Sequence, residues 1–149
     1  MSKVLILFGS TTGNTESIAE KINSLLSDKG AECTLTNAAS VSDCAGLAKD
    51  YDAVLMGCSC WGDEDVELQD DFQAVFDGIG DMGLEGKKVA AFASGDSSYT
   101  HFCGSVEVIE DAAKAAGATI VAGGLKVEGD ASAAPSEIED FANSVAAAL

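Results

Sequence analysis

Positive charge is scarce in this 149-residue sequence. Its eight basic residues are all lysine, arginine is absent, and 25 acidic residues leave a formal net charge of −17. Nucleic-acid-binding proteins contact phosphates through clustered lysine and arginine, so we expect no nucleic-acid partner. An acidic surface keeps a protein soluble and can also steer basic partner proteins toward it; the composition leaves both interpretations open.

Stabilising cross-links and membrane segments are also missing. The five cysteines are scattered without a C-x-x-C pair, and His101 is the only histidine, so we expect neither a disulfide framework nor a zinc site. No uncharged stretch approaches the roughly 18 residues of a membrane-spanning helix. Met1 is followed directly by a strand-like segment, so we expect no signal peptide. We therefore expect a cytoplasmic protein that does not bind membranes.

Short apolar segments alternate with segments of helical period, which predicts an α/β fold. The length suits one domain, so we expect a single domain spanning residues 1–149. The alternation indicates a doubly wound parallel sheet with helices on both faces. The expected strands are Val4–Phe8, Cys33–Thr36, Ala53–Gly57, Val89–Ala93 and Thr119–Val121, with Leu125–Val127 as a candidate continuation of the last.

Three further segments carry apolar residues at the spacing of a helix that packs on a sheet, and a fourth helix is expected to open at Pro135. Gly30 and Gly117 stand where the first and third would end. Ser136 and Glu139 fit a capping box in the fourth. The apolar positions are Ile18, Ile22, Leu25 and Leu26, then Leu68, Phe72, Val75 and Phe76, then Val108, Ile109, Ala112, Ala113 and Ala116.

The loop after the first strand is typical of a phosphate site. Ligands of open α/β sheets bind at the carboxyl ends of the strands, where the strand order reverses. The Gly9–Thr15 segment there combines glycines, four hydroxyls and an asparagine at a helix start, whose free N–H groups favour an anion. No lysine lies between Lys3 and Lys21, and G-x-G-x-x-G is absent, so common nucleotide loops do not match. A loop that only caps the helix is the alternative.

Two aromatic residues stand among polar residues after the third and fourth strands. Trp61 is the only tryptophan, and Tyr99 follows Gly95-Asp96 by three residues. Two rings that project from neighbouring loops at one sheet edge can hold a flat conjugated ring between them. The alternative for Trp61 is an ordinary core residue.

These loops, in this order and spacing, resemble the short-chain flavodoxins over the whole chain. The resemblance implies a five-stranded parallel sheet of order 2-1-3-4-5, which is taken from the family and not worked out from this sequence. It also implies one non-covalently bound FMN. The implied function is a low-potential one-electron carrier that shuttles electrons between redox proteins through the semiquinone/hydroquinone couple, and not an enzyme.

The resemblance further implies which residues hold FMN. The first loop would bind the phosphate, and Trp61 and Tyr99 would flank the isoalloxazine. The Gly62 carbonyl would accept a hydrogen bond from flavin N5 after one-electron reduction. Ser59 would face the ribityl chain, and backbone groups near Ser94 would face the pyrimidine end. The full set is Ser10, Thr11, Thr12, Gly13, Asn14, Thr15, Ser59, Cys60, Trp61, Gly62, Asp63, Ser94, Gly95, Asp96, Tyr99, His101, Phe102 and Cys103.

Three positions depart from the family pattern, and we expect altered tuning rather than lost binding. Cys60 stands where threonine is common, Ser94 where cysteine is common, and His101 replaces a frequent aromatic. Independently of the family, both ring-holding loops lack lysine, and acids cluster beside Trp61. These acids would oppose the anionic reduced flavin and attract reductases, cytochromes and oxidoreductases with basic surfaces. The acidic charge also favours a monomer.

Three other functions fit parts of the sequence. A receiver domain of two-component signalling shares the architecture but needs a lysine at the end of a later strand, where this chain has Ala93-Ser94. An FMN-dependent quinone or nitro reductase needs a substrate pocket, for which the chain has no spare segment. A cysteine-based catalyst using Cys103 or Cys60 would have His101 as its only plausible base.

Overall fold

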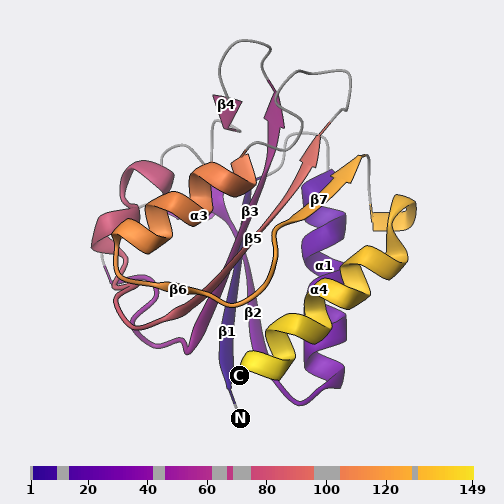
Figure 1. Cartoon of the computed structure of the whole chain (residues 1–149), viewed down its shortest axis with the longest axis horizontal. Coiled ribbons are helices and arrows are strands. Elements are labelled where there is room, and N and C mark those ends of the chain that lie inside the picture. Colours follow the sequence, from indigo (N-terminus) through magenta and orange to yellow (C-terminus); the bar gives the residue numbers. More distant parts are fainter. Residues whose placement is uncertain are drawn as a thin grey trace.

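The chain folds into a β-sheet with helices on both faces (Figure 1). The structure is a computed structural model that describes residues 2–9, 14–41, 46–61, 67–68, 75–95, 105–128 and 131–149. The strands are β1 (Lys3–Gly9), β2 (Glu32–Asn37), β3 (Ala53–Trp61), β4 (Glu67–Leu68), β5 (Lys88–Gly95), β6 (Thr119–Ile120) and β7 (Leu125–Glu128). The helices are α1 (Asn14–Asp28), α3 (Ser105–Ala115) and α4 (Pro135–Ala148), with 3₁₀ turns η1 (Ala38–Ser40), η2 (Ile79–Asp81) and η3 (Ala131–Ala133).

The strand order confirms the predicted sheet. β2, β1, β3 and β5 are parallel neighbours in that order, and the fifth place is shared by two strands. β6 pairs with the start of β5 and β7 with its end, so the expected fifth strand and its continuation are two parts of one edge. If β5 is counted as the fourth strand and β6 with β7 as the fifth, this is the 2-1-3-4-5 arrangement of the family.

One element departs from the prediction. The spacing of apolar residues placed Leu68 in a helix, and this prediction was wrong, because Glu67–Leu68 forms β4. β3 continues to Trp61, four residues beyond the expected strand, and β4 pairs antiparallel with its last two residues. The extended β3 offers backbone N–H and C=O groups that need partners, and this requirement outweighs a helical spacing of apolar side chains.

The two faces of the sheet carry separate hydrophobic layers. α1 and α4 cover one face, and α3 with η2 covers the other (Figure 1). Residues 4–9 of β1 are all buried, as the continuous apolar sequence of a strand covered on both faces requires. Apolar side chains of α1 recur every three or four residues toward this sheet, and Ile18, Ile22 and Leu26 are fully buried.

The helix ends test the cap predictions. Gly30 and Gly117 have φ of +93° and +94°, a left-handed conformation that glycine adopts without steric cost. The N–H after each glycine bonds back to the helix: that of Ala31 donates to the Leu26 carbonyl at 3.1 Å. The predicted capping box at Ser136 was wrong, because α4 begins at Pro135 with Ala134 before it and no side-chain cap. The fixed φ of proline already suits the first helical position.

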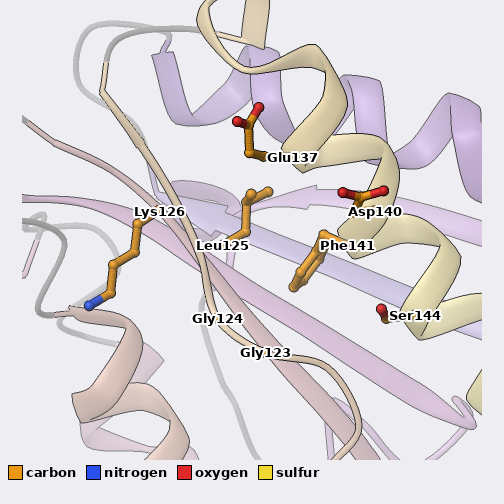
Figure 2. A pocket seen from close by; sticks show the side chains of 8 residues that line it. All are labelled: Gly123, Gly124, Leu125, Lys126, Glu137, Asp140, Phe141 and Ser144. Atoms are coloured by element: carbon orange, nitrogen blue, oxygen red, sulfur yellow. The ribbon is translucent and has the colours of Figure 1, made fainter.

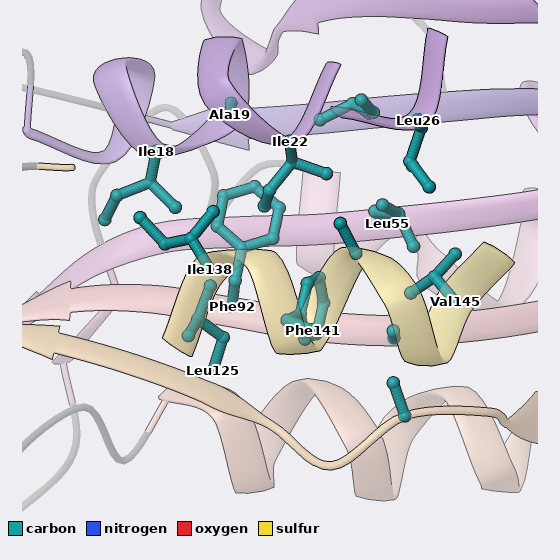
Figure 3. Packing of buried hydrophobic residues seen from close by; sticks show 14 of the residues in the cluster. Ile18, Ala19, Ile22, Leu26, Leu55, Phe92, Leu125, Ile138, Phe141 and Val145 are labelled. Carbon is teal, nitrogen blue, oxygen red and sulfur yellow. The ribbon is translucent and has the colours of Figure 1, made fainter. Parts of the chain in front are cut away.

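A close approach between β3 and β5 fixes the layer under α1 and α4. Gly57 and Phe92 are direct partners in the parallel register. A Cβ atom on Gly57 would lie 2.3 Å from Phe92 Cε2, so the Phe92 ring occupies the space that a side chain would need. The ring then meets Phe141 of α4 edge-on, with centroids 6.4 Å apart and planes at 67° (Figure 3). Gly57 thus allows the ring that joins α4 to the sheet.

We expect Gly57→Ala to destabilise the fold by about 1–3 kcal/mol, because overpacking a full core forces side chains out of their preferred rotamers. Urea denaturation followed by circular dichroism measures the loss. Gly80→Ala is the matched control, since a Cβ there meets no atom within 4 Å. Equal stability of the two variants would contradict the close contact, and Phe92→Leu should recover part of the loss in the Gly57→Ala background.

Candidate functional site

The carboxyl ends of three central strands lie side by side, as the sequence predicted. Gly9 at the end of β1 pairs with Cys58 of β3, which in turn pairs with Ala93 of β5. One residue further, Ser94 of β5 lies between Ser59 of β3 and Val127 of β7. The three connections that carry the candidate residues therefore start from one edge of the sheet, on either side of the point where the strand order reverses.

Two buried hydroxyls meet at this edge. Thr15 is fully buried in the first turn of α1, and Ser94 is 2% exposed near the end of β5. Their oxygens, Thr15 Oγ1 and Ser94 Oγ, lie 2.6 Å apart, a hydrogen-bonding distance for two hydroxyls. Within the described part of the chain these two residues are the buried polar side chains. Polar groups are costly to bury without hydrogen bonds, so their position marks this edge as a polar site.

The structure describes part of the predicted set of site residues. Asn14 is the first residue of α1, and Gly95 ends β5. Ser59, Cys60 and Trp61 end β3, so Trp61 belongs to a strand and not to a loop as expected. The remaining members lie outside the described residues: Ser10, Thr11, Thr12, Gly13, Gly62, Asp63, Asp96, Tyr99, His101, Phe102 and Cys103.

Sequence reasoning missed a residue that ties the chain together beside this edge. Ser17 is the fourth residue of α1. Its hydroxyl accepts a hydrogen bond of 3.0 Å from the backbone N–H of Ala131. Ala131 opens η3, which follows β7. This contact joins the start of α1 to the connection after the last strand. The only sequence signal was a hydroxyl close to a helix start, which is too common to single out Ser17.

Lysine is distributed unevenly about the sheet. All eight lysines lie among the described residues, and six of them are at the amino ends of strands or the carboxyl ends of helices, which is the edge opposite the candidate site. Lys126 of β7 lies nearer the candidate edge, where it forms an ion pair with Glu107 of α3. Lys21 is in the middle of α1. The six are Lys3, Lys29, Lys49, Lys87, Lys88 and Lys114.

A hollow elsewhere on the surface does not involve the predicted residues. It measures about 450 Å³ and lies between α4 and the chain that leads into β7 (Figure 2). Leu125 and Phe141 form its apolar floor, and the exposed carboxylates of Glu137 and Asp140 stand along α4. In the described residues no histidine, cysteine and carboxylate side chains gather in a group that could hold a metal ion. The helices described here are all too short or too polar to cross a membrane.

The site fits a group that carries a phosphate. The first turn of α1 offers backbone N–H groups and the positive end of the helix dipole. Thr15 adds a buried hydroxyl at that turn, and Ser94 adds a second hydroxyl from the neighbouring strand. No lysine lies at the start of α1, so the donors suit a phosphate that is held in place and not transferred.

Comparison with known proteins agrees with this description. The sequence profile of the flavodoxin family matches residues 6–143. A flavodoxin of Maridesulfovibrio salexigens is 48% identical over 130 residues, which are 87% of this chain and 88% of the relative. A flavodoxin of Nitratidesulfovibrio vulgaris is 41% identical over the full length of both chains. Among solved structures, a flavodoxin of Streptococcus pneumoniae superposes with a TM-score of 0.89 at 28% identity, covering 99% of this chain and 100% of the other.

These comparisons define an electron-transfer protein and not an enzyme. The chain belongs to the flavodoxin family, whose members carry electrons on FMN and exchange them with redox partner proteins. The family assignment excludes the receiver, reductase and cysteine-based alternatives.

Cys58 and Cys33 have surroundings that suit structural residues. Cys58 is fully buried in β3, and Cys33 is half-buried in β2 and outside any disulfide. Burial raises the pKa of the Cys33 thiol above its ordinary value of 9.0, and a hydrogen bond with Ser27 offsets part of the increase. A raised pKa leaves less of the reactive thiolate at neutral pH.

We expect native Cys33 to react with iodoacetamide at least about tenfold more slowly at pH 7.5 than in the urea-unfolded protein, because burial limits both access and ionisation. Peptide mass spectrometry after timed alkylation measures the rate at this one cysteine. Since the folded pKa is raised, the associated stability is present below pH 9.0 and is lost as pH rises through the folded value. An alkylation rate of Cys33 that is equal in the native and the unfolded protein would contradict a structural role for this thiol.

Proposed function

We propose that this chain is a low-potential, one-electron carrier with one non-covalently bound FMN, held in a single domain that spans residues 1–149. When bound, FMN supplies the redox chemistry by taking up and releasing electrons one at a time. The thiol of Cys33, half-buried and outside any disulfide, supports a reducing compartment, the cytoplasm, as its place of work.

The proposed binding residues lie in the three connections that follow β1, β3 and β5, and each connection contacts a different part of the cofactor. The segment from Ser10 to Thr15 binds the phosphate, and the support for this is the buried Thr15 hydroxyl at the start of α1. Trp61 and Tyr99 cover the two faces of the ring, and the Gly62 carbonyl accepts a hydrogen bond from it in the reduced form. The other members surround the ribityl chain and the polar ring edge: Ser59, Cys60, Asp63, Ser94, Gly95, Asp96, His101, Phe102 and Cys103.

The charge distribution supports a low potential, and it is the observation that carries this part of the proposal. Six lysines lie at the far edge of the sheet, and Lys126 is neutralised by Glu107. Six acids, by contrast, fall within residues 63–71, beside Trp61 in sequence. A carboxylate about 10 Å from an added negative charge opposes it by roughly 1.7 kcal/mol at an effective dielectric of about 20. For one electron this is on the order of 70 mV, before screening by salt.

The same asymmetry supports partners with basic surfaces, such as reductases, cytochromes and oxidoreductases. The acids that stand beside Trp61 in the sequence would raise the local concentration of positively charged proteins and orient them on approach. The excess of negative charge also opposes self-association, so we propose that the carrier is a monomer.

We expect the purified protein to bind one FMN and to take up two electrons in separate steps. During stepwise anaerobic reduction, a long-wavelength absorption band should rise to a maximum near half-reduction and then disappear. Visible spectroscopy with a calibrated reductant measures both steps. Bleaching in one two-electron step would overturn the one-electron function, and failure of the apoprotein to bind added FMN would overturn the cofactor assignment.

We expect the triple variant Asp63→Asn/Glu64→Gln/Asp65→Asn to raise the lower of the two potentials by roughly 100 mV or more at low ionic strength, since three opposing charges are removed. Spectroelectrochemistry in equilibrium with dyes of known potential measures the shift. The matched control is Asp28→Asn/Glu32→Gln/Asp50→Asn, which makes the same change in net charge at the far edge of the sheet.

The control should shift the potential less than half as much as the triple variant, because its charges lie at the opposite edge of the sheet and a Coulomb interaction weakens with distance. Equal shifts in the two variants would mean that net charge alone sets the potential. No shift in either would contradict the electrostatic account.

A further inference from the structure

Ser94 and Thr15 come from distant parts of the sequence. The strand and the helix that carry them both border the proposed phosphate site. The two residues are 79 residues apart, one in the first turn of α1 and the other near the carboxyl end of β5. Their side-chain oxygens lie 2.6 Å apart with almost no exposure to water. Water therefore cannot replace either hydroxyl as a partner for the other without a change in packing.

The pairing of β5 with β3 and β7 fixes the position of the Ser94 backbone. Ser94 pairs with Ser59 on one side and Val127 on the other, and the preceding Ala93 is fully buried. The backbone of β5 at this point is held by both neighbouring strands, whereas Thr15 is the second residue of a helix. The Ser94 hydroxyl is thus a fixed point on the sheet to which the start of α1 is attached.

We infer that the Ser94 hydroxyl is a positioning residue for the phosphate: it holds Thr15 in the orientation in which Thr15 donates to a phosphate monoester. This inference depends on the proposed FMN site. Either hydroxyl can donate to the other in the structure. A bound phosphate dianion only accepts hydrogen bonds, so Thr15 donates to it and Ser94 donates to Thr15. The two hydroxyls then form a relay of aligned donors, in which a charged acceptor strengthens both bonds.

If Ser94 positions Thr15 for the phosphate, its removal should weaken the binding of a flavin that carries a phosphate more than that of one without it. FMN carries the phosphate, and riboflavin has the same ring and ribityl chain without it. If Ser94 acts through Thr15, removal of its hydroxyl weakens FMN binding more than riboflavin binding. A residue that only supports the fold would weaken both flavins by the same factor.

The test is Ser94→Ala, with dissociation constants of the apoprotein for FMN and riboflavin measured by the quenching of flavin fluorescence. The preference for FMN is the ratio of the riboflavin dissociation constant to the FMN dissociation constant. We expect this ratio to fall about tenfold, because the buried Thr15 hydroxyl loses the donor that orients it. Ser94→Cys keeps a side chain of similar size with a weaker donor, so its preference for FMN should lie between those of the parent and Ser94→Ala.

A double-mutant cycle with Thr15→Val tests whether the effect passes through Thr15. Valine keeps the shape of threonine without the hydroxyl, so Ser94→Ala should change the preference less than twofold in that background. The matched control is Ser17→Ala, which removes another hydroxyl of α1, bonded at 3.0 Å to the Ala131 N–H and not to Ser94. Its preference for FMN should stay within about twofold of the parent.

Three results would overturn the inference. Equal loss of FMN and riboflavin affinity in Ser94→Ala would make Ser94 a structural residue. Effects that add up in the double variant would separate Ser94 from Thr15. A loss of preference in Ser17→Ala as large as in Ser94→Ala would indicate general loosening of α1. A parent protein that binds riboflavin but shows no preference for FMN would instead contradict the proposed phosphate site itself.

Discussion

Parallel pairing of β1, β3 and β5 is the constraint on which the other features depend. In this register, Gly9, Cys58 and Ala93 lie in one row across the sheet, so the chain leaves three strands at the same level. Each strand is buried on both faces and has little freedom to slip, because a shift by one residue would exchange the side chains of the two layers. The functional edge is therefore as well defined as the core beneath it.

The sequence predicted the sheet and its edge because their signals are continuous. Runs of buried apolar residues mark strands covered on both faces, and glycines with positive φ end α1 and α3. The errors arose where backbone pairing or one residue's fixed geometry decided the outcome. Leu68 joined a strand because β3 continues to Trp61, and Pro135 replaced a side-chain cap with its own φ. Neither effect changes the pattern of apolar residues, so spacing alone could not reveal it.

The candidate site was predictable by residue type but not by contact. Hydroxyls next to a helix start indicate an anion site, and Thr15 was proposed as a site residue in this way. The partnership of Thr15 with Ser94 joins positions 79 residues apart and depends on the register of β5. A serine at the end of an apolar strand has many possible uses, and only the folded sheet shows which hydroxyl it faces. The same holds for Ser17 and Ala131.

Charge, in contrast to packing, is not dictated by the fold. A parallel sheet with covered faces needs neither an excess of acids nor lysines at its amino edge, and the repulsion within a chain of net charge −17 reduces its stability. The lysines nevertheless gather where strands begin and helices end, and Lys126 is paired with Glu107. This arrangement places most of the positive charge at the edge of the sheet opposite the candidate site. In the function proposed above, an electron carrier would gain from it twice, because a field that makes the reduced form a stronger donor also attracts a basic acceptor.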